Sequence, residues 1–113
     1  MHELSIAYSI VEIVNEEARK ANATKVSEVE LEVGTLSGVE VEALEFAMEA
    51  SIKDTIMKDA EVRIIKRQAR AHCNNCENDF ECVSLFDPCP KCNGFENEIT
   101  QGREMNVKSL VVE

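Results

Sequence analysis

The spacing of apolar residues predicts a long amphipathic helix at the start of the chain. There the apolar positions step by three and four residues, which is the period of one helix face. The predicted helix ends near Asn22, and isoleucines widen its apolar face, so it should pack heavily against a core. The apolar positions are Leu4, Ile6, Ala7, Ile10, Val11, Ile13, Val14, Ala18 and Ala21.

A half-buried strand and a second helix follow. The stretch KVSEVELEVG alternates, with Val29, Leu31 and Val33 on one face and glutamates on the other, which is typical of a strand with one buried face and one solvent-exposed face. After the loop TLSG, Ser37 and Glu40 fit a capping box and predict a helix start. The residues of this helix expected to face the core are Val41, Leu44, Met48 and Ile52.

Two more strands complete the predicted sheet. The stretch AEVRIIKRQARA is interpreted as one strand, and MNVKSLVVE, which follows Gly102 and ends the chain, as another. Together these elements predict an α+β fold in which two helices pack on a three-stranded sheet. All five cysteines and both prolines lie between the last two strands, so that segment is a separate, inserted lobe.

The formal net charge of −10 over 113 residues narrows the classes of partner. Nucleic-acid affinity comes largely from Lys and Arg, so a chain this acidic is not expected to bind nucleic acid. It could bind a metal cation or a basic protein, although soluble cytosolic proteins are commonly acidic too. No apolar run reaches the roughly 20 residues needed to cross a bilayer, and the N-terminus lacks the basic region of a secretory signal. We therefore expect a cytoplasmic protein without a membrane partner.

The cysteine-rich segment carries the strongest chemical signal. Cys73 and Cys76 form one CxxC motif, Cys89 and Cys92 form another, and twelve residues separate them. Four thiolates from two tight turns can surround one ion in the tetrahedral arrangement that zinc accepts. A rubredoxin-like iron site has similar spacing, and disulfides could use the same cysteines, although a reducing compartment disfavours them. We predict a zinc-ribbon lobe at residues 71–97, inserted into a domain made of residues 1–70 and 98–113.

Other residues of the ribbon are open to two interpretations each. Cys82 is a small hydrophobic residue on the ribbon or an alternative ligand during metal exchange, and His72 is a surface residue or a spare ligand. The residues around the cysteines are mostly acidic, which favours a protein-facing or structural lobe over a nucleic-acid module. The chain shows no nucleophile–base arrangement and no glycine-rich phosphate loop, so we do not expect an enzyme.

The first three residues, Met1, His2 and Glu3, form a candidate chelate. The α-amine of Met1, the amide and imidazole nitrogens of His2, and an amide or carboxylate of Glu3 lie within a few bonds of one another. Nitrogen-rich, planar ligation suits Ni(II) or Cu(II), and nickel fits better because cells usually handle copper as Cu(I) on soft sulfur ligands. The alternative is that His2 simply precedes a helix.

Four stretches taken together resemble the HypA family of hydrogenase nickel-incorporation proteins. They are MHELS, EVGTLSGVE, the paired CxxC motifs and ITQGREMNVKSLVVE, in this order over essentially the whole chain. The resemblance implies a metallochaperone that carries Ni(II) as transient cargo at Met1, His2 and Glu3, with structural zinc on Cys73, Cys76, Cys89 and Cys92. It also implies a HypB-type GTPase partner, delivery to the large subunit of [NiFe]-hydrogenase and, in some members, service to urease maturation. An interaction module built on a zinc ribbon is the alternative.

Overall fold

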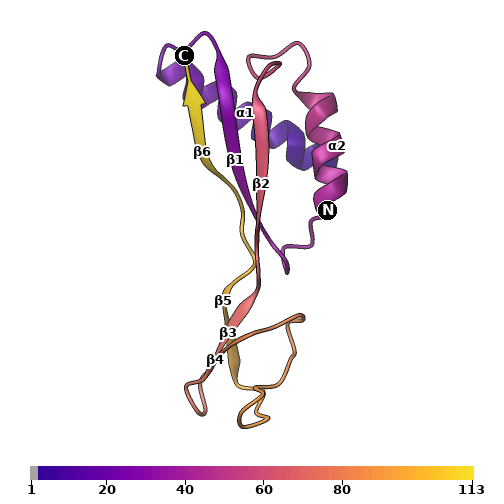
Figure 1. Ribbon diagram of the computed structural model, residues 1–113, viewed down its shortest axis with the longest axis vertical. Helices are drawn as coiled ribbons and strands as arrows, with labels where there is room; N and C mark the ends of the chain where they lie inside the picture. Colours follow the sequence, from indigo (N-terminus) through magenta and orange to yellow (C-terminus); the bar gives the residue numbers. More distant parts are fainter. Residues whose placement is uncertain (1–2) are drawn as a thin grey trace.

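The computed structural model describes residues 3–113, and the chain forms an elongated molecule of 54 × 25 × 17 Å. Two lobes lie end to end along the long axis, as Figure 1 shows. The larger lobe holds both helices and one sheet, and the smaller lobe holds a second sheet and all the cysteines. The predicted α+β fold with an inserted cysteine lobe is therefore confirmed.

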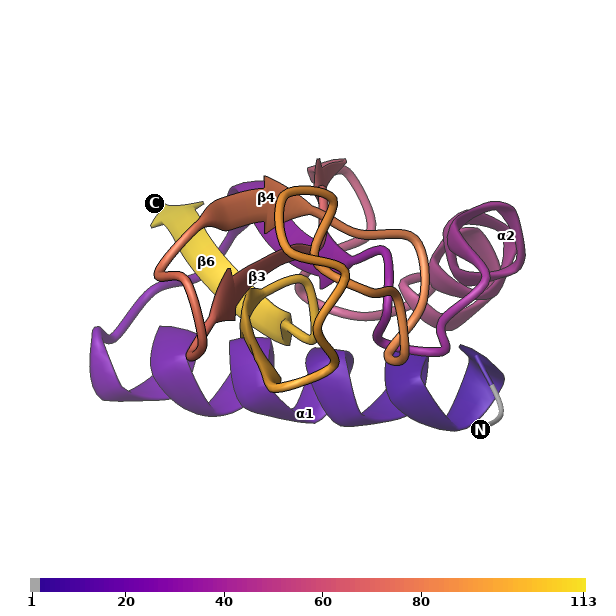
Figure 2. The ribbon, with the colours of Figure 1, turned by 90° about the horizontal axis from the view of Figure 1, so that it is seen from below.

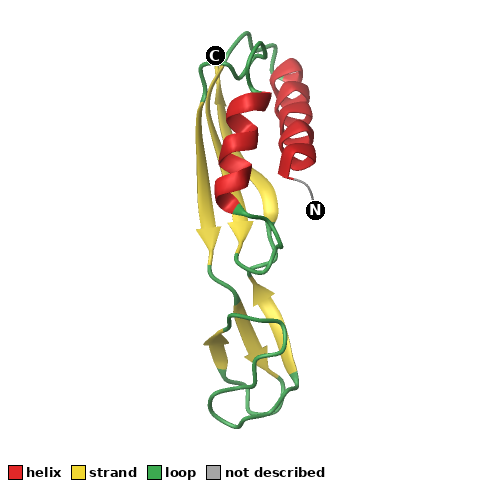
Figure 3. Cartoon of the chain, turned by 90° about the vertical axis from the view of Figure 1, so that its right-hand side faces the viewer, coloured by secondary structure: helices red, strands yellow, loops and turns green. Residues whose placement is uncertain are grey.

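The larger lobe is a three-stranded sheet with both helices on one face (Figure 3). Its elements are α1 (Glu3–Lys20), β1 (Val26–Gly34), α2 (Val41–Ser51), β2 (Glu61–Arg67) and β6 (Met105–Val112). The strand order is β2-β1-β6, with β1 and β2 parallel and β1 and β6 antiparallel. Parallel neighbours need a crossover connection, and α2 provides it.

The core lies between the helices and the sheet. The valines and leucine of β1 predicted to point inward, Val29, Leu31 and Val33, are fully buried, and α2 adds Leu44 and Met48. Seen along the long axis in Figure 2, α1 runs beneath the sheet. Its buried face is formed by Ile6, Ala7, Ile10, Val11, Val14 and Ala18.

Two local predictions were wrong. The apolar stripe of α1 is narrower than predicted, because Leu4, Ile13 and Ala21 are exposed. Ser37 is not the N-cap of α2. Glu40 holds that position without a side-chain cap, while the Ser37 hydroxyl accepts a bond from the Val39 N–H at 3.2 Å.

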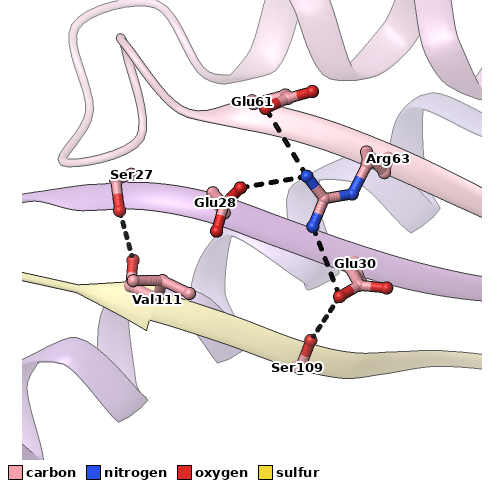
Figure 4. Close-up of polar contacts among 7 residues, drawn as sticks. All are labelled: Ser27, Glu28, Glu30, Glu61, Arg63, Ser109 and Val111. Carbon is pink, nitrogen blue, oxygen red and sulfur yellow. Dashed lines mark hydrogen bonds and ion pairs between the residues drawn. The ribbon is translucent and has the colours of Figure 1, made fainter.

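The solvent-exposed face of the sheet carries an ion-pair cluster centred on Arg63 (Figure 4). Its guanidinium lies 3.0 Å from Glu28, 3.3 Å from Glu30 and 3.5 Å from Glu61. The Ser109 hydroxyl donates to Glu30 at 3.2 Å, so all three strands are linked. Hydrogen bonds from Ser109 and then from Arg63 lower the pKa of Glu30. The acidic stripe of β1 is thus partly neutralised by its neighbours.

The predicted strand over residues 60–71 is interrupted. It divides into β2 and β3 (Arg70–Cys73), and Gln68 and Ala69 lie between them. The smaller lobe is a second sheet of order β4-β3-β5, whose other strands are β4 (Asp79–Glu81) and β5 (Asn97–Gln101). The strand β5 was not predicted. One long apolar-alternating stretch therefore supplies a strand to each lobe.

Close backbone contacts join the two lobes. The Leu36 N–H donates to the Gly102 carbonyl at 2.8 Å, and the Ala69 N–H donates to the Thr35 hydroxyl at 2.9 Å. Gly102 has φ +115°, and a Cβ there would lie 2.4 Å from Cα of Ala69, so only glycine fits. A Cβ on Gly34 would lie 2.0 Å from the Gly102 oxygen. The junction is therefore packed backbone against backbone.

No helix within residues 3–113 is long and apolar enough to cross a membrane.

Candidate metal centres

The four cysteines of the two CxxC motifs meet at one point in the smaller lobe. Their sulfur atoms all lie within 4.8 Å of one another. The Sγ atoms of Cys73 and Cys92 are 3.6 Å apart, as are those of Cys76 and Cys89. Each close pair therefore joins one motif to the other, so both motifs face the same centre.

The two motifs have the same backbone geometry. In the first, the Glu77 N–H donates to the Cys73 carbonyl at 2.8 Å and the Cys73 N–H to the Asn78 carbonyl at 2.8 Å. In the second, the Asn93 N–H donates to the Cys89 carbonyl at 2.7 Å and the Cys89 N–H to the Gly94 carbonyl at 2.9 Å. In each turn the residue four positions after the first cysteine has a positive φ, namely Glu77 and Asn93.

The sulfur cluster fits a tetrahedral metal ion. Zinc–thiolate bonds of about 2.3 Å place the sulfurs of a tetrahedron about 3.8 Å apart, close to the 3.6 Å observed. Disulfide bonds are about 2.0 Å long, and none of the five cysteines is disulfide-bonded. Cys73 and Cys89 are fully buried, while Cys76 and Cys92 are half-buried. A closed set of four thiolates is the arrangement of structural zinc sites.

Hydrogen bonds favour the thiolate form in the second motif. Burial alone would raise the pKa of Cys89, but N–H groups of Cys92, Lys91 and the Asn78 side chain outweigh it and lower the pKa to about 6. For Cys92, the Gly94 N–H and then the Asn75 side chain lower the pKa. Metal binding requires deprotonated sulfur, so these contacts favour loading of the site.

In the first motif, the surroundings of Cys76 raise its pKa and so disfavour the thiolate form. The Asn78 backbone N–H acts to lower the pKa of Cys76. Desolvation and the neighbouring thiol groups outweigh that bond and raise the pKa to about 12. The two motifs therefore share one backbone geometry, but their sulfur atoms differ in how strongly they are stabilised as thiolates.

Cys82 and His72 lie outside the four-sulfur set. Cys82 is 2% exposed and packs in the small apolar cluster of the smaller lobe, and burial raises its pKa. His72 Nδ1 lies 2.8 Å from an oxygen of Asp79 across the β3–β4 pair. The interpretation of Cys82 as a small hydrophobic residue agrees with this position.

The second candidate centre is the start of the chain. Met1 and His2, two of its three predicted ligands, lie outside the described residues. The third, Glu3, opens α1, and its carboxylate accepts a hydrogen bond from the Glu40 N–H at 3.2 Å. Glu40 stands at the start of α2, so the beginnings of both helices meet here. Sequence reasoning did not place Glu40 beside Glu3, because 37 positions separate them.

A groove of ≈ 410 Å³ adjoins this corner. It is lined by Glu3, Leu4, Ala43, Phe46, Ala47 and Ala50. Leu4 is 45% exposed and Phe46 is 73% exposed, so large apolar side chains stand in solvent next to Glu3. The start of the described chain is therefore accessible and bordered by apolar surface.

The chain is similar over its whole length to proteins of one family. The family model described as "Hydrogenase/urease nickel incorporation, metallochaperone, hypA" matches residues 1–112. A hydrogenase maturation factor HypA from Parabacteroides distasonis is 46% identical, covering 99% of this chain and 97% of the relative. One from Chlorobaculum parvum is 42% identical, with both chains fully covered.

Two solved structures share the fold. The solution structure of the Ni metallochaperone HypA from Helicobacter pylori is 29% identical, covers 99% of this chain and 97% of that chain, and has a TM-score of 0.71. A second solution structure of a HypA protein is 30% identical, covers 100% and 97%, and has a TM-score of 0.74. The arrangement of both lobes thus has solved counterparts.

Proposed function

Since the chain belongs to the HypA family of hydrogenase and urease nickel-incorporation metallochaperones, we propose that it carries Ni(II) at its N-terminus. The proposed ligands are the Met1 α-amine, nitrogen atoms of His2, and Glu3. We further propose that a HypB-type GTPase takes part in the transfer and that the large subunit of a [NiFe]-hydrogenase receives the metal. Nickel is the cargo, whereas zinc on Cys73, Cys76, Cys89 and Cys92 is the structural metal of the smaller lobe.

The observation that carries this proposal is the contact between Glu3 and Glu40. The Glu3 carboxylate is held by the N–H at the start of α2, so the residue next to His2 has a defined position. A chelate formed mainly by consecutive residues can open without disturbing the core, which begins at Ile6. These features support a site that binds selectively and still releases its metal.

The groove beside Glu3 supports this corner as the place where a transfer partner approaches. Transfer requires a partner to reach the nickel ligands, and Leu4 and Phe46 are exposed there. Exposed apolar patches often mark protein interaction sites, and aromatic side chains such as Phe are enriched in interfaces. We therefore propose that the GTPase contacts the surface around Leu4 and Phe46.

Nucleic-acid binding by the ribbon is the weaker alternative. Glu77, Asp79 and Glu81 are exposed beside the first cysteine motif, and they would repel phosphate. We also propose that this nickel carrier works in the cytoplasm and is not an enzyme.

The test is calorimetric nickel titration of zinc-loaded protein with a native, untagged N-terminus. The chain has two histidines, so His72→Ala is a matched control for His2→Ala. We expect about one nickel per chain for the wild type and for His72→Ala, and loss of that binding for His2→Ala. Binding should also weaken below neutral pH, as the imidazole and the α-amine become protonated near ~6.5 and ~8. Equal nickel binding by wild type and His2→Ala would refute the N-terminal site.

A further inference from the structure

The carboxamides of Asn75 and Asn78 make the four-cysteine site chemically asymmetric. Asn75 lies inside the first motif, yet its Nδ2 donates to Cys92 Sγ of the second motif at 3.6 Å. Asn78 follows the first motif, and its Nδ2 donates to Cys89 Sγ at 3.7 Å. One side-chain donor lies within the first motif and the other lies two residues after it, whereas both acceptors belong to the second motif.

The sulfur atoms of the first motif have fewer such donors. Cys73 Sγ accepts from the Cys76 N–H at 3.5 Å, and Cys76 faces one N–H, that of Asn78. Cys89 additionally faces the N–H groups of Lys91 and Cys92, and Cys92 faces that of Gly94. Within residues 3–113 no side-chain amide donates to Cys73 or Cys76. More of the negative charge therefore stays on the sulfurs of the first motif.

Exposure separates the two sulfurs within each motif. Cys73 and Cys89 are completely buried, whereas Cys76 and Cys92 are half-buried. A reagent in solution can therefore approach Cys76 or Cys92 first. Of these two, Cys92 carries a carboxamide bond and Cys76 does not.

We propose that Cys76 is the first residue of the loaded zinc site to react with a soft electrophile, and that Asn75 protects Cys92 from the same reaction. A hydrogen bond to a thiolate lowers the energy of its lone pairs and so its nucleophilicity. Contacts of this kind around metal ligands tune the reactivity of the ligands. The asymmetry depends on the zinc site alone and not on nickel delivery.

The reaction with a maleimide is an addition. A sulfur lone pair of Cys76 attacks the carbon–carbon double bond, and a C–S bond forms. The π electrons of that double bond form an enolate, which takes a proton from water. The product is a neutral thioether, which is a poorer zinc ligand than a thiolate, so modification of Cys76 weakens the attachment of the first motif to the metal.

The experiment maps alkylation in the zinc-loaded, full-length protein. The protein is treated with a limiting amount of N-ethylmaleimide, digested, and quantified at each cysteine by mass spectrometry, while zinc release is followed with a chromogenic chelator. We expect Cys76 to be modified about fivefold ahead of Cys92, the factor that one net hydrogen bond corresponds to. Cys82 is nearly inaccessible and should stay unmodified.

Asn75→Ala should raise alkylation of Cys92 until it approaches that of Cys76. Asn74→Ala is the matched control, because Asn74 is an exposed neighbour whose side chain makes no hydrogen bond within the described chain. The control should keep the wild-type ratio. Modification of Cys92 first in the wild type, or an unchanged ratio in Asn75→Ala, would overturn the proposal.

A spectroscopic measurement covers the case in which Asn75→Ala holds zinc poorly. In the cobalt-substituted protein the sulfur-to-cobalt charge-transfer band reports the energy of the thiolate lone pairs. Removing a carboxamide donor in Asn78→Ala should move this band to lower energy, and Asn74→Ala should not move it. A band unaffected by Asn78→Ala would show that the carboxamide does not tune its thiolate, and would refute the asymmetry.

Discussion

Removing zinc should unfold the smaller lobe and leave the larger lobe folded. The buried cluster of the smaller lobe consists of Ala69, Ala71, Cys73, Phe80, Cys82 and Cys89. Phe80 is the one large apolar side chain among these buried residues, and two of the cysteines, Cys73 and Cys89, belong to the proposed zinc site. The core of this lobe is therefore built largely around that site.

The free energies involved explain why the smaller lobe should unfold without zinc. Burial of a phenylalanine contributes about 1.5–3 kcal/mol, and a structural zinc site contributes roughly 10–16 kcal/mol of apparent binding free energy at neutral pH. Whole domains are stable by only about 5–15 kcal/mol, so the apolar cluster cannot replace the metal. The larger lobe keeps its own core, which includes Leu31, Leu44 and Met48 and contains none of the four clustered cysteines.

The assay compares amide correlation spectra of zinc-loaded and chelated protein under reducing conditions. Amides of residues 71–97 should lose their dispersion, while those of the larger lobe keep theirs. Helical circular dichroism should hardly change, because both helices lie in the larger lobe. Dispersed signals for residues 71–97 without metal would refute the folding role of zinc. Loss of the helical signal would instead show that the two lobes unfold as one unit. Added zinc should restore the original spectrum.

Two further predictions concern the junction and the sheet. Gly102→Ala should lower the melting temperature, because strained positive-φ positions cost about 1–3 kcal/mol and the new Cβ would lie 2.4 Å from Cα of Ala69. The control is Gly38→Ala, since Gly38 has φ +82° but open space around it. An equal drop in melting temperature for both variants would rule out the close contact as the cause. The lowered pKa of Glu30 means that its carboxylate stabilises the fold above the unfolded value near ~4.3 and loses this effect as the pH falls through the lower folded value. Glu30→Gln should therefore be less stable than wild type at pH 7 and converge with it in acid, as measured by urea unfolding at the helical signal; a constant difference at all pH values would contradict this.

Local sequence patterns predicted most of the secondary structure. The alternation in β1 survives in the fold, because residues two apart on a strand share a face whatever the tertiary context. The three-and-four spacing likewise located α1, although the sheet covers only part of its apolar stripe and leaves Leu4 and Ile13 in solvent. How wide a buried stripe becomes depends on what packs against it, and periodicity does not contain that information.

Predictions failed where a long-range contact replaced a local rule. The stretch over residues 60–71 looks like one strand, but its chain leaves the first sheet at Gln68 and Ala69 and joins the second. The strand β5 is defined by its pairing with β3 and has little apolar alternation of its own. At the start of α2 the sequence fits a capping box, yet the Ser37 hydroxyl bonds within its own turn, and the Glu40 N–H donates to Glu3, 37 positions away.

The four cysteines could be assigned from the chain alone, because two CxxC turns each present two sulfur atoms and four thiolates suit few ions. The same local argument named Met1, His2 and Glu3 as a chelate, since consecutive residues are neighbours in any fold. Tertiary structure was needed to bring Glu40 to Glu3 and the carboxamides of Asn75 and Asn78 to the second motif. The partners in those contacts are 37, 17 and 11 positions apart in the sequence. Local sequence patterns do not show that such residues are neighbours, because only the folded backbone brings them together.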